Sequence, residues 1–424
     1  MRKKRLNLLK KLGMMYTTTG KSEKAVEKFK EALKYCKTSR EKADILIQIG
    51  IAYQRTSRYP ESLDYLNQAL GKLSRTSPCI ERANAYSEIS WVLYLIGKTK
   101  EAITYAKKGL DEINSIEENE EVIIRRGRIY NVLASIYKGK GEEKTSYDYY
   151  LKALKEYQKV GYLKGMASIY NNLCGHYSSQ GEFEKAIESL EKSLKIDREI
   201  GEPLGEAIST YNLGEEFINV NDLKKAKAYL DEYQRINKEI HNRLGEGWAN
   251  EGYGEIERLK KNYSKAIEHF KKAIKIFREV GSEVKEYSAK MGLCGTLIDK
   301  NEIAKAIPLL AEIEKYASNS SQHWMLDRVY ELKGDIFAKN KKWNKSAEYY
   351  KKAVEITEHR NYIAGLPVLY YKMGKVFENI DKKRAKLYLN KAKKILRSII
   401  SKFKNKDLKE KFIKKEINQK ILSV

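Results

Sequence analysis

The chain has 424 residues, of which 33% are charged and only five are proline, and it carries a formal net charge of +26. No stretch approaches the ~18 consecutive apolar residues that a membrane-spanning helix requires. The basic start MRKKR leads into LNLLKKLGMM, where two lysines interrupt any signal-peptide core. The composition therefore excludes a transmembrane protein and predicts a cytoplasmic one rich in helix.

From the N-terminus onward, two columns of small residues recur, mostly at intervals of 40 residues with extremes of 37 and 44. The column that opens the second helix of each predicted pair is Ala25, Ser62, Ala102, Ser146, Ala186, Ala226, Ala266, Ala306, Ser346 and Ala385. The column in the first helix, eleven or twelve residues earlier, is Gly13, Gly50, Ser90, Ala134, Cys174, Gly214, Gly254, Cys294, Gly334 and Gly374. Two antiparallel helices approach closely only where both side chains are small, so the columns predict ten helical pairs in an all-α chain.

Large apolar residues follow the second column four positions later, from Phe29 and Leu66 to Phe270 and Leu389, which is the spacing of one helical face. The reversals between helices are also regular. Residues that tolerate a left-handed backbone stand at the expected helix ends: Gly20, Gly97, Gly141, Gly161, Gly181, Gly201, Asn221, Gly281 and Asn301. Short turns are therefore expected throughout, without a linker.

Two segments depart from this regularity. The interval of 44 residues places an expansion of four residues near residues 115–125. The last segment is strongly basic, so we predict a repeat array over residues 1–392 and basic capping helices over residues 393–424. A repeat array needs a polar cap of this kind to shield its last apolar face.

The basic charge is concentrated at the two ends. Residues 1–40 contain 13 Lys or Arg against 3 Glu, and residues 393–424 contain 11 against 3 acidic residues. A basic end attracts acidic partners or nucleic acid. Lysine dominates here, whereas bidentate phosphate recognition favours arginine. We interpret the charge as solvated helix faces, with an acidic protein partner and then nucleic acid as alternatives.

The repeats resemble a known family. REIGEPLGEAISTYNLGEEF and SSQGEFEKAIESLEKSLKIDREIG are similar to tetratricopeptide repeats of the longer type, about 40 residues, found in kinesin light chains and bacterial signalling proteins. KDLKEKFIKKEINQKIL resembles the final helices of repeat arrays attached to signal-transduction ATPases of the STAND type. The resemblance implies a right-handed α-solenoid of about ten repeats, a concave groove lined by the first helix of each pair, and a protein or peptide partner.

Within that implied groove, we select polar and aromatic candidates from the inward-facing columns. Asn131 and Asn171 occupy equivalent places in adjacent repeats, and a carboxamide can both donate to and accept from a peptide backbone. The aromatic candidates are Trp91, Tyr94, Tyr211 and Trp248, which provide contact area at small entropic cost. Packing within the array is the alternative for each of them.

An acidic cluster on the same columns runs against the net charge of the chain. Its members are Glu215, Glu251, Glu255, Asp299, Glu331 and Asp335, with Arg258 and Arg328 beside them. Stacked like charges repel one another unless they are solvated or neutralised. Three interpretations stay open: a basic segment of a partner binds there, the acids pair internally, or they form solvated surface.

Catalytic, metal and cofactor motifs are not found in the sequence. The four cysteines lie far apart, and neither a GxxxxGK[ST] loop nor an HExxH helix occurs. We therefore expect a non-enzymatic interaction scaffold or sensor without a cofactor. The alternatives are a peptide-pheromone receptor, although residues 1–40 form a repeat in place of the usual effector domain, and a nucleic-acid-associated protein that uses its basic ends. The sequence predicts no oligomeric state.

Overall fold

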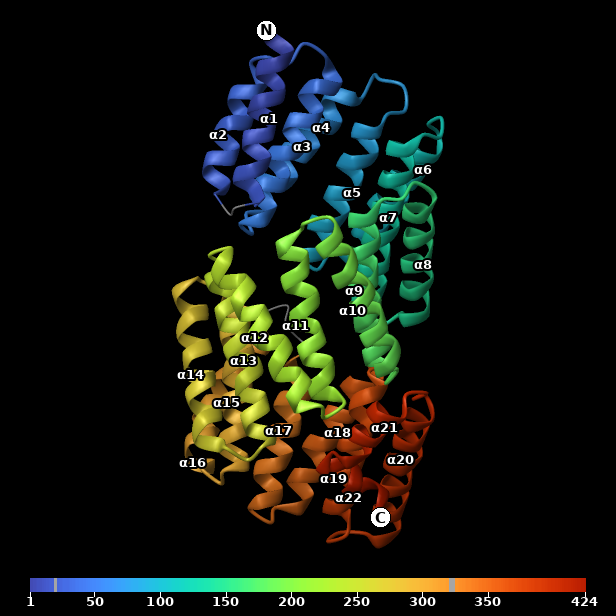
Figure 1. Ribbon diagram of the computed structural model, residues 1–424. Coiled ribbons are helices and arrows are strands. Elements are labelled where there is room, and N and C mark those ends of the chain that lie inside the picture. The colour runs from blue at the N-terminus through green and yellow to red at the C-terminus, as the bar shows by residue number, and fades with distance from the viewer. Residues whose placement is uncertain (19–20, 320–324) are drawn as a thin grey trace. The chain divides into compact units, whose positions relative to one another are not determined.

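The computed structural model describes residues 1–18, 21–319 and 325–424. In this part of the chain the regular structure is helical, and successive helices form antiparallel pairs (Figure 1). The chain divides into two compact units, Met1–Ile169 and Tyr170–Val424. The division falls inside α9 (Leu163–Ser179), where the repeat spacing is unbroken.

The first unit contains four helical pairs and the start of α9. Its helices are α1 (Arg2–Thr18), α2 (Ser22–Leu33), α3 (Ser39–Arg55), α4 (Tyr59–Leu73), α5 (Ile80–Leu95), α6 (Thr99–Asn114), α7 (Glu120–Gly139) and α8 (Glu143–Lys159). The expansion predicted near residues 115–125 becomes the 115–119 connection together with the 20-residue α7. The Asn119 side chain caps α7 by accepting a hydrogen bond from the Val122 backbone N–H at 3.0 Å.

The second unit continues the same pairing from α9 to the C-terminus. Its helices are α10 (Phe183–Glu199), α11 (Pro203–Asn219), α12 (Leu223–Glu239), α13 (Arg243–Leu259), α14 (Tyr263–Glu279), α15 (Glu283–Asp299), α16 (Ile303–Asn319), α17 (Leu326–Lys339), α18 (Trp343–His359), η2 (Ile363–Gly365), α19 (Leu366–Phe377), α20 (Lys382–Ser401), α21 (Lys406–Lys414) and α22 (Glu416–Leu422). The chain therefore contains ten pairs among its described residues, as predicted, followed by two short helices.

The small-residue columns lie at the helix crossings, which confirms their predicted role. Every member of the second column is at most 3% exposed. A Cβ atom on Gly334 would lie 2.5 Å from the Tyr350 ring, so the first helix carries glycine where the second carries a large residue. At two of the three serines in this column the hydroxyl reaches the opposite helix: Ser62 Oγ donates to the Gly50 carbonyl and Ser346 Oγ to the Gly334 carbonyl, each at 2.8 Å.

The turns have the left-handed backbone that the sequence predicts. Gly97 and Asn221 have φ values of 81° and 65°, and the other predicted positions in the described residues agree. Gly20 lies outside the described residues. The same turn positions are also left-handed where the sequence has no glycine or asparagine, as at Lys261 and Lys341. There the turn is held by backbone bonds such as Asn262 N–H to Glu257 C=O at 2.8 Å, which offset the cost of that conformation.

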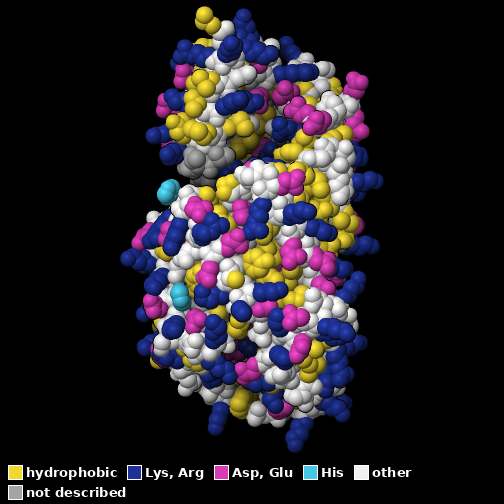
Figure 2. Space-filling view, in the orientation of Figure 1, with side chains coloured by type: hydrophobic (Ala, Val, Ile, Leu, Met, Phe, Trp, Pro, Cys, Tyr) yellow, Lys and Arg dark blue, Asp and Glu magenta, His cyan; other side chains and the backbone are white. Residues whose placement is uncertain are grey.

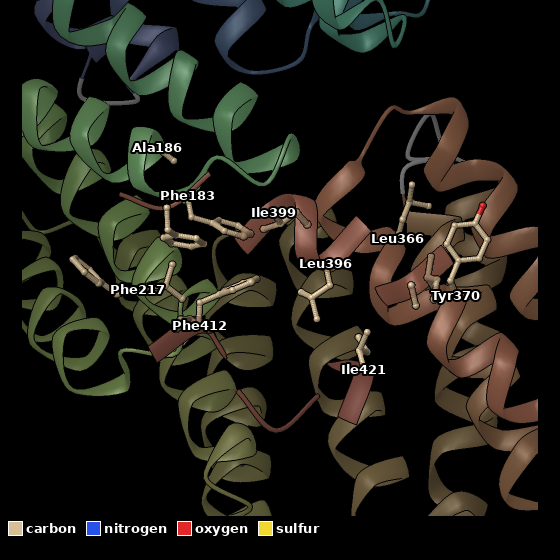
Figure 3. Close-up of a cluster of buried hydrophobic side chains, with 14 of the residues drawn as sticks. Phe183, Ala186, Phe217, Leu366, Tyr370, Leu396, Ile399, Phe412 and Ile421 are labelled. Atoms are coloured by element: carbon tan, nitrogen blue, oxygen red, sulfur yellow. The ribbon is translucent and has the colours of Figure 1, made fainter. Parts of the chain in front are cut away.

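The C-terminal helices pack onto the second unit instead of extending the array. Residue 392, where the predicted array ends, lies inside α20. One hydrophobic core joins Phe183 on α10 to Leu396 and Ile399 on α20, Phe412 on α21 and Ile421 on α22 (Figure 3). The segment 404–422 therefore contacts helices that precede it by about 200 residues in sequence.

Basic and acidic side chains are scattered together over the face shown in Figure 2. Many form pairs one helical turn apart, for example Lys272 with Glu268 at 2.7 Å. Most of the cationic surface in this view is therefore mixed with acids, as the interpretation of solvated helix faces requires. Among the described residues, no helix combines the length and apolarity needed to cross a membrane.

Candidate functional site

The second unit contains a partly open cavity of about 640 Å³. Its wall is formed mainly by the first helices of successive pairs, namely α11, α13, α15, α17 and α19. The C-terminal helices complete the wall with Phe412, Lys415, Ile417 and Asn418. A helix faces one side at intervals of three or four residues, so each of these helices presents a short row of side chains to the cavity.

Six of the candidate residues from the sequence line this cavity. They are Tyr211, Glu215, Glu251, Glu255, Arg258 and Glu331. Arg328, which the sequence placed beside the acids, also lines it. The structure therefore brings together side chains from α11, α13 and α17, which lie up to 120 residues apart in the sequence.

Part of the acidic cluster is neutralised internally. Arg258 donates to Glu255 at 2.6 Å and to Asp299 at 2.9 Å. Lys372 donates to Glu331 at 2.7 Å and to Asp335 at 2.8 Å. Burial opposes ionisation of Glu331, but the charges of Arg328 and Lys372 outweigh it and hold the pKa of that carboxyl below its usual range. These acids are thus already paired, as the second of the three interpretations proposes.

Glu215 and Glu251 differ from the other acids of the cluster. In the part of the chain that the structure describes, neither forms an ion pair within 4 Å. The Glu251 carboxylate accepts a hydrogen bond from the Ser288 hydroxyl at 2.6 Å. Burial and the charges of Glu251, Glu255 and Glu216 raise the pKa of Glu215 to about 8. Burial raises the pKa of Glu251 as well, against the effects of Ser288 and Lys285.

An aromatic group borders these two acids. The Tyr211 ring centroid lies 5.1 Å from those of Tyr233 and Trp248. The Lys285 ammonium stands 4.1 Å from the centroid of the Trp248 ring, a cation–π arrangement. The Trp248 Nε1 atom is buried without a hydrogen-bond partner in the described residues. Trp248 itself is not part of the cavity wall, so it supports the wall through Tyr211.

The other candidates lie elsewhere. Asp335 accepts hydrogen bonds from the Tyr350 hydroxyl and Lys372, and Asn171 accepts one from the Asn212 carboxamide at 2.8 Å, so both are engaged within the array. Asn131 on α7 belongs to the first unit, as do Trp91 and Tyr94 on α5, whose ring centroids are 5.5 Å apart. The binding roles of these five residues stay predictions.

Several wall residues were not selected from the sequence, notably Ser288, Phe412 and Lys415. Ser288 belongs to α15, the first helix of its pair, and lies three residues before Met291, which also lines the cavity. Helical periodicity could have identified it. Phe412 and Lys415 carry no such signal, because they reach the cavity only when the C-terminal helices return to the second unit.

The described residues contain no group of three or more His, Cys, Asp or Glu side chains placed to hold a metal ion. The four cysteines are buried thiols. Burial raises the pKa of Cys294 to about 12, so this thiol is un-ionised at neutral pH. The side chains that line the cavity can act through charge, hydrogen bonding and aromatic contact.

Two family models, each described as tetratricopeptide repeat, match the sequence. One matches residues 41–111 and 165–239, and the other matches residues 127–159 and 327–360, together about half of the chain. No curated protein matches the sequence.

Solved structures with similar folds cover most of the chain at low sequence identity. A Rap protein complexed with competence and sporulation factor is 14% identical, over 94% of this chain and 100% of its own, with a TM-score of 0.52. The apo form of the quorum sensor NprR from B. thuringiensis is 16% identical, over 74% of this chain and 86% of its own, with a TM-score of 0.53. At these identities the likeness concerns the fold.

A third similar structure belongs to a larger protein. It is a Signal Transduction ATPase with Numerous Domains (STAND) protein with a tetratricopeptide repeat sensor from Pyrococcus horikoshii. It is 16% identical over 95% of this chain, with a TM-score of 0.52. The match covers 55% of that protein, so this chain spans about half of its length.

Proposed function

The chain belongs to the tetratricopeptide repeat family, and from this premise we propose that it is a non-catalytic binding protein whose second unit takes a short cationic peptide. Lysine or arginine side chains of the peptide would bind at Glu215 and Glu251. Tyr211, which lines the cavity beside these acids, would provide the apolar contact, with Trp248 packed against it.

One observation carries this proposal: Glu215 and Glu251 line a partly open cavity and form no ion pair among the described residues, whereas their neighbours Glu255 and Glu331 do. Burying a carboxylate without a counter-charge is unfavourable, and the pKa values of both groups are raised accordingly. A ligand cation at this position would remove that cost by pairing with the acids. The site is therefore complementary to positive charge, even though the chain as a whole is strongly cationic.

The size of the cavity favours a compact ligand. Its volume of about 640 Å³ lies within the ~300–1,000 Å³ that small-ligand sites usually occupy. With the C-terminal helices in place, this volume suits a few residues of peptide.

The fold neighbours support the choice of a peptide as ligand. One of them is a Rap protein in complex with competence and sporulation factor, and another is the quorum sensor NprR. On this basis we propose, more specifically, that the chain is a peptide-responsive regulator. The screen described next identifies the peptide.

The test is a screen of synthetic tetra- and pentapeptides, retained by the immobilised full chain and identified by mass spectrometry. We expect the retained peptides to carry Lys or Arg. Isothermal titration of the best peptide against the Glu215→Gln, Glu251→Gln double variant should then show a loss of about 10- to 100-fold, since a hydrogen bond to a charged group contributes about 1.5–3 kcal/mol.

The matched control is Glu268→Gln, a change of the same kind at an exposed residue of α14. It should leave the affinity of the selected peptide unchanged. The proposed site is wrong if the chain retains only neutral or acidic peptides, or retains none. It is also wrong if the selected peptide binds the double variant as tightly as it binds the control.

A further inference from the structure

The C-terminal helices cover a defined surface of the second unit. On this surface the Phe412 ring centroid lies 5.3 Å from that of Phe183 on α10 and 5.2 Å from that of Phe403 (Figure 3). Phe183 and Phe412 are 6% and 5% exposed. An aromatic anchor of α21 thus fills an apolar site formed by a helix more than 200 residues earlier in the sequence.

Polar contacts hold the same segment in register. The Lys411 ammonium donates to Asp222 Oδ2 at 2.8 Å, and the Asn221 side chain donates to the Lys411 carbonyl at 3.4 Å. Lys415 donates to the Asn219 carbonyl at 3.5 Å and borders the cavity. Lys411 and Lys415 are four residues apart, so both lie on one face of the C-terminal segment and meet the turn between α11 and α12.

Asp222 has two functions in this contact. Its Oδ1 atom accepts from the Lys225 backbone N–H at 3.1 Å and caps α12, while its Oδ2 atom accepts from Lys411. Burial opposes ionisation of Asp222, but the hydrogen bonds from Lys411 and the Lys225 backbone N–H, together with the charges of these lysines, outweigh it and lower the pKa of the carboxyl. The docking surface therefore presents an ionised acid at a helix end, next to an apolar site.

The segment itself has little order of its own. α21 has nine residues and α22 has seven, and isolated helices shorter than about 12–15 residues are marginal in water. Six lysines and two acids lie in residues 404–415, so the segment is strongly basic even though Lys411 pairs with Asp407 and Lys414 with Glu410. Its helical form depends on the surface that it covers.

We propose that residues 404–422 are a replaceable occupant of this surface, and that the surface accepts a lysine-rich amphipathic helix from a partner protein. The partner would carry the pattern seen in α21, which is a lysine followed directly by an aromatic residue and a second lysine four positions after the first. The first lysine would bind Asp222 and the aromatic ring would contact Phe183. The displaced segment would lose its helices.

This inference rests on other contacts than the peptide proposed for Glu215 and Glu251, namely those of Lys411 with Asp222 and of Phe412 with Phe183, although Phe183 and Phe412 also line the cavity. The probe is a fluorescein-labelled synthetic peptide of residues 404–422, added in trans to the full chain. We expect weak binding to the parent, and binding about tenfold tighter or more to Lys411→Glu, which releases the internal segment and leaves Asp222 free.

A second substitution identifies the contact. Adding Asp222→Asn to Lys411→Glu should abolish most of the gain, because asparagine keeps the cap on α12 but offers no charge to the lysine of the probe. Lys406→Glu, an equal charge change at an exposed position of α21, should bind the probe as the parent does. The Glu215→Gln, Glu251→Gln variant should also match the parent, which separates this proposal from the cavity ligand.

The proposal is overturned if the probe binds Lys411→Glu no more tightly than the parent, or if the gain in affinity persists when Asp222→Asn is added.

Hydrogen exchange of the parent alone provides a test that needs no variant. Amides of α21 and α22 should exchange at least about tenfold faster than those of α20, because a replaceable segment opens locally. If the amides of α21 and α22 exchange as slowly as those of α20, the segment is a fixed part of the core and the proposal is wrong.

Discussion

Glu215 and Glu216 are neighbours in the sequence, but their environments differ. Glu215 borders the cavity, whereas Glu216 is buried in the core, where the Cys174 thiol donates to it at 3.7 Å and the Asn219 side chain at 3.4 Å. Burial raises the pKa of Glu216 to about 7, and burial together with nearby acids raises that of Glu215 to about 8. Both carboxyls are therefore largely protonated at slightly acid pH.

This titration predicts how stability depends on pH. Between the unfolded pKa near 4.5 and the folded values of about 7 and 8, the folded chain holds more protons than the unfolded chain, so these two groups lower stability as pH rises. Removing the titration with Glu215→Gln and Glu216→Gln should raise the melting temperature at pH 8.5 relative to the parent by more than at pH 5. If the difference in melting temperature between variant and parent is the same at both pH values, the raised pKa values are wrong.

At the scale of helices, close crossings set the geometry of every pair. Ala266 on α14 is fully buried, and the facing Gly254 of α13 would place a Cβ atom 3.0 Å from the Phe270 ring. The two helices therefore approach without room for larger side chains. This explains why the small columns persist while the surrounding residues vary from repeat to repeat.

Ala266→Leu should destabilise the second unit by about 1–3 kcal/mol, because added methylenes force helices apart or side chains off their rotamers. Ala311→Leu on α16 adds the same atoms at an exposed position and should leave stability nearly unchanged. Urea denaturation of both variants provides the measurement. Equal midpoints for the two would show that the crossing is not tight.

At the scale of the whole second unit, its first helices contact its last helices. The Lys402 ammonium donates to the Gln180 carbonyl at 2.7 Å, and the Gln180 side chain donates to the Asn361 carbonyl at 3.0 Å. Phe183 adds the aromatic contact with Phe403 and Phe412. An open solenoid has contacts only between neighbouring repeats. These bonds couple helices separated by about 200 residues.

Phe183→Ala should therefore reduce hydrogen-exchange protection at both α10 and α19–α22, with a cost of about 3–5 kcal/mol for a buried phenylalanine. The control is Phe217→Ala, which removes a local stack on Tyr229 at 5.4 Å and should affect α11 and α12 first. If Phe183→Ala lowers protection only in α9–α11, the ends of this unit are not coupled energetically.

Local spacing was enough to predict much of this protein. The ten pairs, the buried alanine and serine column and the left-handed turns all follow from residues at most about 12 positions apart, because helix geometry and close crossings act over that range. The same periodicity placed Glu215 and Glu251 on helices that line the cavity.

Long-range contacts decided the rest. Whether an acid of the cluster is paired depended on cations such as Lys372, which lies 41 residues from Glu331. The division into two units falls within α9, where no composition change marks it. Lys411 meets Asp222 across 189 residues, and no periodic pattern links two residues so far apart. Such contacts arise only when the repeats curve far enough for their ends to meet, and that curvature is a sum of small packing angles that single residues do not encode.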